Sequence, residues 1–130
     1  MIMEITVGMK GEATNLAERE DTALEVGSGS LLVYATPCMA ALMEAAACDA
    51  ISDALDENET TVGIALDLKH TSATPVGMEV RAEAEVTAVE GKIFTFHIVA
   101  FDEAGQIGEA THKRALVNAQ RFLDKTYAKL

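Results

Sequence analysis

Apolar residues occur nearly all the way round the helical wheel between Thr36 and Leu55, which predicts a long helix in the core. Thr36 suits the N-cap position, and Pro37 suits the first helical position, where its missing N–H costs nothing. A polar stripe on one arc of about 100° should face solvent, formed by Asp49, Ser52, Asp53 and Asp56. A helix this apolar needs a sheet wrapped around it.

Glu44 lies outside that polar stripe. Its neighbours on the wheel are small or apolar, namely Ala40, Ala41, Ala47, Cys48 and Ile51. If the helix is buried, the carboxylate lies in or beside the core, which is costly unless it has a partner or a chemical role. Glu44 is therefore a candidate functional residue.

Alternating apolar and polar residues after this helix predict a series of strands. The first strand covers residues 60–70, and its inward row is Val62, Ile64, Leu66, Leu68 and His70. Residues 78–89 alternate cleanly, so one face must be wet, as in antiparallel sheets. Short turns at 90–91 and 103–105 lead into strands over 92–102 and 106–118, which predicts a meander.

The two ends of the chain complete the predicted architecture. Residues 4–26 hold one or two extended segments, the second being TALEV, and residues 27–30 form a flexible Gly-Ser linker. Residues 119–130 predict a short amphipathic helix docked on the sheet, with Phe122, Leu123, Thr126, Tyr127 and Leu130 on its apolar stripe. The whole pattern predicts one α+β domain over residues 1–130, a curved antiparallel sheet around a central helix.

Composition narrows the possible functions. The formal net charge of −11 argues against nucleic acid as the main partner, because phosphate binding rests on Lys and Arg. An anionic ligand would need a local basic patch, for which Lys69, Lys113 and Arg114 are the candidates. Neither a signal peptide nor a membrane span is apparent, so we expect a cytoplasmic protein. Cys38 and Cys48 lie about 15 Å apart along one helix and cannot bridge, and no metal site is expected.

Three stretches together resemble a known family. They are ATPCMAALME at the helix start, GIALDLKHTSATPVGM at the end of the following strand, and IGEATHKRALV in the last strand. The chain resembles the hot-dog fold acyl-CoA thioesterases, and most closely the fluoroacetyl-CoA thioesterase group. The resemblance implies that Thr36, Glu44 and His70 are catalytic and that Gly63 lies near the bound thioester. Arg114 matches an arginine of the family's last-strand motif and is a further candidate for substrate binding. It departs from that group at residues 27–34, where the expected lid segment has no Phe, so fluoroacetyl selectivity is not predicted.

Each of these residues has a possible role in thioester hydrolysis. Glu44 could attack the carbonyl or activate water, and His70 could orient or protonate a reacting group. Thr36 begins the helix, where the N–H groups of Cys38 or Met39 could stabilise the oxyanion. Alternatively, Thr36 is only a cap and His70 only a core histidine. Arg114 could meet the phosphates of CoA or balance nearby acids.

We therefore predict a thioesterase that hydrolyses small acyl-CoA substrates and needs no cofactor. A homodimer is expected, because a single wrapped sheet leaves an open edge and an open helix flank, with the substrate cleft between subunits. His97 and His112 are expected to be structural or surface residues. The alternatives are a hot-dog hydratase or dehydratase, and a non-catalytic module that binds acyl-CoA or another small ligand.

Overall fold

A computed structural model describes residues 4–130, and the central helix is its organising element. Helix α2 spans Thr36–Ile51 and continues as a single 3-10 turn over Ser52–Ala54. Ala35 is its N-cap, so Thr36 is the first helical residue and not the cap that the sequence predicted. The capping prediction was wrong, because the hydroxyl of Thr36 is used elsewhere. The predicted polar stripe is exposed at all four of its positions.

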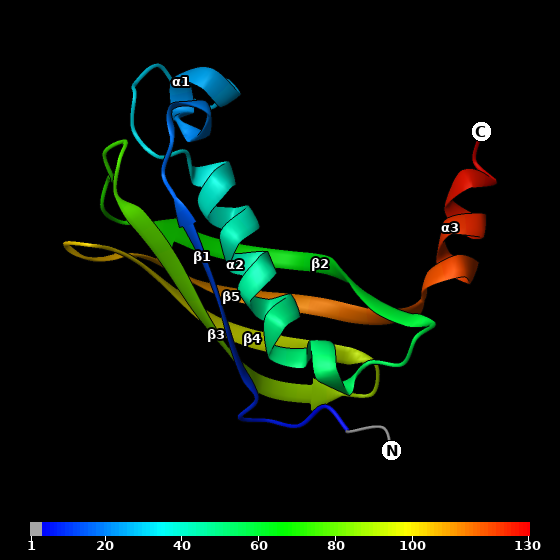
Figure 1. The fold of residues 1–130 in the computed structure, drawn as a ribbon. Coiled ribbons are helices and arrows are strands. Elements are labelled where there is room, and N and C mark those ends of the chain that lie inside the picture. The colour runs from blue at the N-terminus through cyan, green and yellow to red at the C-terminus, as the bar shows by residue number, and fades with distance from the viewer. Residues whose placement is uncertain (1–3) are drawn as a thin grey trace.

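Five antiparallel strands curl around α2, as Figure 1 shows. They are β1 (Lys10–Leu16), β2 (Glu59–His70), β3 (Glu79–Glu90), β4 (Ile93–Asp102) and β5 (Gly105–Asn118). Their order across the sheet is β1-β3-β4-β5-β2. The predicted α+β architecture and the meander of β3, β4 and β5 are confirmed, and β2 lies at one edge of the sheet.

The core lies between α2 and the concave face of the sheet. The inward rows of β3 and β4 follow the predicted alternation, with Val80, Ala82, Ala84 and Val86 facing Phe94, Phe96, Ile98 and Ala100. From the helix, Met39, Met43, Ala46 and Ala47 are buried against them. Small residues along β3 let the helix approach closely.

A β-bulge in β2 overturns the predicted inward row of that strand. The pairing with β5 shifts between Gly63 and Ala65, so Ile64 is the extra residue and its side chain is 52% exposed. Before the bulge the inward residues are Thr61 and Gly63, whereas after it they are Leu66, Leu68 and His70. Because of the bulge, Thr61 and Gly63 lie on the inner face, where Val62 and Ile64 were predicted.

The ends of the chain differ from prediction in two places. The segment TALEV forms a short helix, α1 (Ala23–Val26), because the Thr22 side chain accepts from the Glu25 N–H and Gly27 ends the turn at a φ of 80°. Helix α3 (Ala119–Tyr127) forms as predicted, but it projects away from the sheet (Figure 1). It follows β5 with no intervening loop, and its apolar residues Phe122, Leu123 and Tyr127 are exposed.

Two smaller expectations concern the cysteines and membranes. Cys38 and Cys48 are both free, as their separation on one helix requires. Among residues 4–130, none of the helices combines the length and the apolar character needed to cross a membrane.

Candidate active site

Thr36 and His70 are the first pair of predicted site residues that the fold brings together. The Oγ1 of Thr36 lies 2.8 Å from Nδ1 of His70, joining the start of α2 to the end of β2. The other ring nitrogen, Nε2, is buried, and no atom of the described residues hydrogen bonds to it. Burial lowers the pKa of His70 below its usual range, against a smaller opposing effect of the Ser72 backbone. The neutral imidazole is therefore favoured, with Nδ1 beside the Thr36 hydroxyl and Nε2 buried.

A cleft of about 250 Å³ opens beside this pair. Thr36 and His70 line it together with residues of the loop after α1 and of the turn after β2, among them Ser28, Tyr34 and Ser72. The cleft has both polar and apolar walls, as a site for a short acyl group requires.

Glu44 occupies a second cluster, two helical turns further along α2. Its side chain is 41% exposed, so it lies beside the core and not within it. The Oε1 of Glu44 accepts a hydrogen bond of 3.2 Å from Nη1 of Arg114 on β5. Of the two interpretations of Arg114, the structure therefore shows the guanidinium balancing an acid. A contact between Arg114 and CoA stays a prediction.

Buried polar groups hold that guanidinium in place. Nε of Arg114 donates to Oγ1 of Thr61 at 2.9 Å, and Nη2 donates to the carbonyl oxygen of Thr61 at 3.0 Å. Nη1 also lies 3.1 Å from Nε2 of His112, which is 1% exposed. The expectation that His112 is a structural or surface residue missed its place beside Glu44, because the sequence does not reveal which strand faces the helix at that point.

Gly63 packs directly over this second cluster. A Cβ atom at residue 63 would lie 2.5 Å from Oε1 of Glu44 and 3.3 Å from Nη1 of Arg114. The bulge in β2 thus gives the Glu44 carboxylate a backbone surface in place of a side chain. The predicted role of Gly63 near the substrate depends on this close approach of its backbone to the Glu44 carboxylate.

The three predicted catalytic residues do not converge within one chain. Thr36 and Glu44 are eight residues apart, so they lie about 12 Å apart along the axis of α2. Glu44 meets Arg114 and His112, and no contact joins it to His70 among the described residues. The fold supplies two clusters on one helix, one at its start and one at its middle.

The backbone amides expected to stabilise an oxyanion are already engaged. The N–H groups of Cys38 and Met39 both donate to the carbonyl oxygen of Ala35, at 3.0 Å and 3.1 Å. That expectation was wrong for both residues. The amide of Thr36, the first in the helix, has no acceptor within the described part of the chain.

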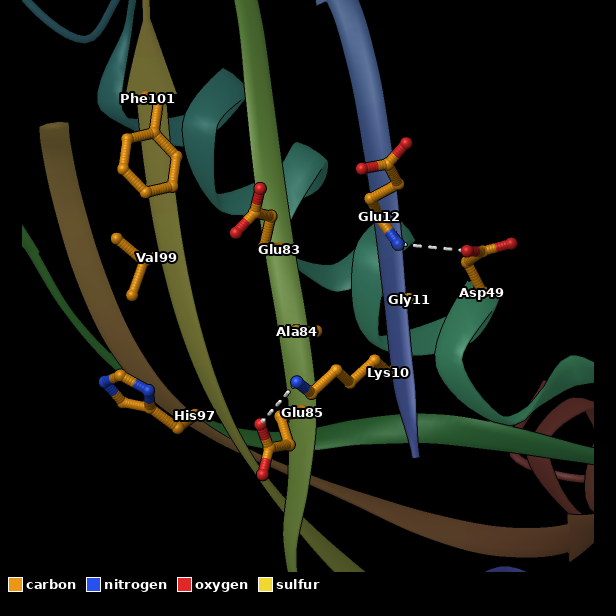
Figure 2. Close-up of a pocket in the computed structure, with 10 residues that line it drawn as sticks. All are labelled: Lys10, Gly11, Glu12, Asp49, Glu83, Ala84, Glu85, His97, Val99 and Phe101. Carbon is orange, nitrogen blue, oxygen red and sulfur yellow. Dashed lines mark hydrogen bonds and ion pairs between the residues drawn. The ribbon is translucent and has the colours of Figure 1, made fainter. Parts of the chain in front are cut away.

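A larger hollow, of about 490 Å³, lies away from both clusters on the outer face of β1, β3 and β4. Figure 2 shows its acidic lining, including Glu12, Glu83 and Glu85, with Lys10 paired to Glu85 and His97 on the adjoining strand. None of the predicted site residues lines it. Its carboxylates repel an anionic thioester, so the chemistry points to the two clusters on α2.

Comparison with known proteins identifies the family. The model of the fluoroacetyl-CoA-specific thioesterase family FlK matches residues 17–120. Over 97 residues the chain is 37% identical to the fluoroacetyl-CoA thioesterase of Streptantibioticus cattleyicolor, covering 75% of this chain and 70% of that protein. A crystal structure of the fluoroacetyl-CoA thioesterase FlK superposes with a TM-score of 0.91 at 29% identity, covering 98% of this chain and 99% of the other.

A more distant neighbour bears on the fold alone. A hot-dog-like protein from Thermanaerovibrio acidaminovorans has a TM-score of 0.87 at 19% identity, covering 97% of this chain and 93% of that one. The curled sheet around α2 is therefore a hot-dog fold. With the family model matching most of its length, the chain belongs to the FlK family of hot-dog acyl-CoA thioesterases, which are thioester hydrolases.

Proposed function

We propose that this protein hydrolyses a small acyl-CoA thioester to the free acid and CoA, with Thr36, Glu44 and His70 as its catalytic residues. The observation that carries the proposal is the hydrogen bond between Thr36 and His70 at the mouth of a cleft, in a chain of this family. Crystallised FlK variants contain acetyl-CoA in one case and fluoroacetate with CoA in another. Acyl groups as small as acetyl and fluoroacetyl fit a cleft of about 250 Å³, whereas CoA itself is too large for it.

The chemistry assigns a role to each residue. Glu44 either takes a proton from the water that attacks the thioester carbonyl, or attacks the carbonyl itself to form an anhydride that water then hydrolyses to the free acid. In both routes CoA leaves as the thiolate, and the proton released from water passes to the thiolate or to solvent. The amide of Thr36 and the positive end of the α2 dipole stabilise the developing oxyanion. His70 holds the hydroxyl of Thr36 in place through its Nδ1 atom. Gly63 and Arg114 flank the Glu44 carboxylate and line the path of the thioester.

We propose further that the active unit is a homodimer and that each site draws on both copies. The outer side of β2 has no partner strand in residues 4–130, and Ala41 and Ala45 expose one flank of α2. A two-fold copy along β2 runs its α2 antiparallel, so its Thr36 and His70 approach Glu44 of the first copy. This closes the separation of about 12 Å between the two clusters.

The decisive test is a thiol-release assay with a panel of short-chain acyl-CoA substrates. We expect turnover by the wild type, and losses of about 100-fold or more in kcat for Glu44→Gln and for His70→Asn. Thr36→Ala should lower kcat, while Thr36→Ser should retain most of it. The proposal would be refuted if thiol were released no faster than background across the panel, or if the substitutions of Glu44, His70 and Thr36 left turnover unchanged.

The thiol-release assay, together with a calorimetric titration, separates the rival functions. A hydratase or dehydratase changes the acyl chain without releasing thiol. A binding module holds acyl-CoA in a calorimetric titration without turnover. The carboxylate of Glu44 on the exposed margin of α2 favours hydrolysis, because a binding module for an anionic ligand gains nothing from a carboxylate there.

A further inference from the structure

His112 is a buried histidine whose two ring nitrogens face different kinds of partner. Nδ1 lies 2.7 Å from the carbonyl oxygen of Ala65, the residue that completes the β2 bulge. Nε2 lies 3.1 Å from Nη1 of Arg114 and 3.8 Å from Oε1 of Glu44. The ring also packs against Phe96, with centroids 6.0 Å apart.

These partners fix the position of the imidazole proton. A carbonyl oxygen only accepts, so Nδ1 must carry the hydrogen. Nη1 of Arg114 only donates, so Nε2 must present its lone pair. His112 is therefore a neutral imidazole with its proton on Nδ1. Burial, the largest influence, also lowers the pKa of His112, which favours this neutral form.

The neutral ring completes the hydrogen bonding of Arg114. Nε and Nη2 of the guanidinium both donate to Thr61, and Nη1 has two hydrogens, one for Glu44 and one for His112. Without the acceptor at Nε2, a buried N–H of Arg114 would lose its partner. Only the two hydrogen bonds to Thr61 and the one to Glu44 would then hold the guanidinium, and the position of Nη1 beside Glu44 would be less strictly fixed.

We propose that His112 is a positioning residue for thioester hydrolysis, which accepts a hydrogen bond from Arg114 and so fixes the guanidinium that orients Glu44. It touches neither substrate nor reacting atoms and acts only through Arg114. Its anchor on the carbonyl of Ala65 also ties the ring to the bulge that places Gly63 over Glu44. The role rests on the proposed hydrolysis.

Three substitutions separate this role from simple packing. His112→Gln places an amide oxygen near the position of Nε2 and keeps the acceptor for Arg114. His112→Asn keeps a donor toward Ala65 but loses that acceptor, and His112→Phe keeps only the ring against Phe96. We expect kcat to fall about 10- to 100-fold for Asn and Phe, with KM changed less than about threefold, and to fall much less for Gln.

A matched control is His97→Phe, which removes an exposed histidine paired with Glu109 on the outer face of the sheet. It should leave kcat unchanged. A purely structural role predicts the opposite order among the His112 variants, because Phe preserves the packing best and would be the least harmful. Equal activity of the Phe and Gln variants, or losses that follow the melting temperature, would overturn the proposal.

Nitrogen NMR of the histidine rings tests the geometry independently of turnover. The His112 signals, assigned by their absence from His112→Gln, should show Nδ1 protonated and Nε2 unprotonated at neutral pH. A proton on Nε2 overturns the positioning role even if the enzyme hydrolyses acyl-CoA. Conversely, a wild type without thioesterase activity but with the expected tautomer defeats the proposed function and leaves the hydrogen-bond assignment standing.

Discussion

Gly63 shows how closely a single residue can control the Glu44 carboxylate. An added methyl group would lie 2.5 Å from Oε1 of Glu44, the far end of a flexible side chain that is able to move. Gly63→Ala should therefore cost little stability but displace Glu44 from Arg114. We expect kcat to fall about 10- to 100-fold, with the melting temperature nearly unchanged, in thiol-release and thermal unfolding measurements.

Gly11 provides the control for that prediction, because it is also a glycine in close contact with α2. A methyl group there would collide with backbone atoms of Ala46 and Ala50, which cannot move without shifting the helix. Gly11→Ala should therefore lower the free energy of unfolding by about 2 kcal/mol or more, since overpacking forces a backbone shift. A stability loss at Gly63 as large as that at Gly11 would contradict the assigned role of Gly63.

Two histidines, the partly buried His70 and the buried His112, make stability depend on pH. Burial holds the pKa values of His70 and His112 below the ordinary value of 6.5, so the unfolded chain binds protons at a higher pH than the folded one. Their contribution is complete above pH 6.5 and is lost as the pH falls through the lower folded values. Urea unfolding from about pH 7.5 to about pH 5.5 should show a declining free energy of unfolding, above the range where carboxyl groups titrate.

His112→Gln gives the control, because it removes one of the two titrating groups. The decline should be shallower in this variant. A free energy of unfolding that is flat over this range in the wild type would refute the assignment of both histidines as buried neutral groups.

Sequence identified some of these residues and missed the relations between them. Glu44 stood out because a carboxylate on an apolar helix is unusual, and no contact information was needed. His112 and Arg114 were visible as residues, but their meeting with Glu44 depends on the register of β5 against β2. That register pairs Gly63 with Arg114 and Leu66 with His112, and it is set by a bulge that alternation does not reveal.

Helices and strands whose apolar residues recur with one regular spacing were predictable, and those with local irregularities were not. The apolar composition of α2 and the alternation of β3 were sufficient to place both. In β2, Ile64 continues the alternation in sequence, and the pattern therefore predicted that it faces inward. The bulge turns its side chain outward. In α1, caps at both ends outweighed the strand-like composition of TALEV.

Helix α3 gives the element-scale prediction. Its apolar residues are exposed, with Phe122 at 41% and Leu123 at 49%, and they contribute little to the stability of one subunit. Replacing both by Ser should change the free energy of unfolding by less than about 0.5 kcal/mol, measured in urea at low protein concentration. A loss of several kcal/mol would show that the helix docks on its own sheet, as its amphipathic pattern suggested.

At the scale of the whole molecule, the separation of the two clusters is the main feature that sequence could not supply. Thr36 and Glu44 are eight positions apart and look close in a sequence motif, yet along the helix axis this spacing is about 12 Å. In the homodimer that we propose, a second copy related by a two-fold axis closes that gap and at the same time covers the edge of β2. The proposal of a shared site follows from this distance.

Mixing two variants, each impaired at a different catalytic residue, tests the shared site directly. Glu44→Gln supplies an intact Thr36 and His70, and Thr36→Ala supplies an intact Glu44. If each site draws on both copies, a mixed dimer has one site with both residues intact and one site with neither. Equal amounts of the two variants, unfolded and refolded together, should recover about a quarter of wild-type activity, because half the dimers are mixed.

Refolding each variant alone before mixing is the control. If the mixture gives only the average of the two residual activities, each site lies within one chain. The substrate itself must then span the distance between Thr36 and Glu44 along α2.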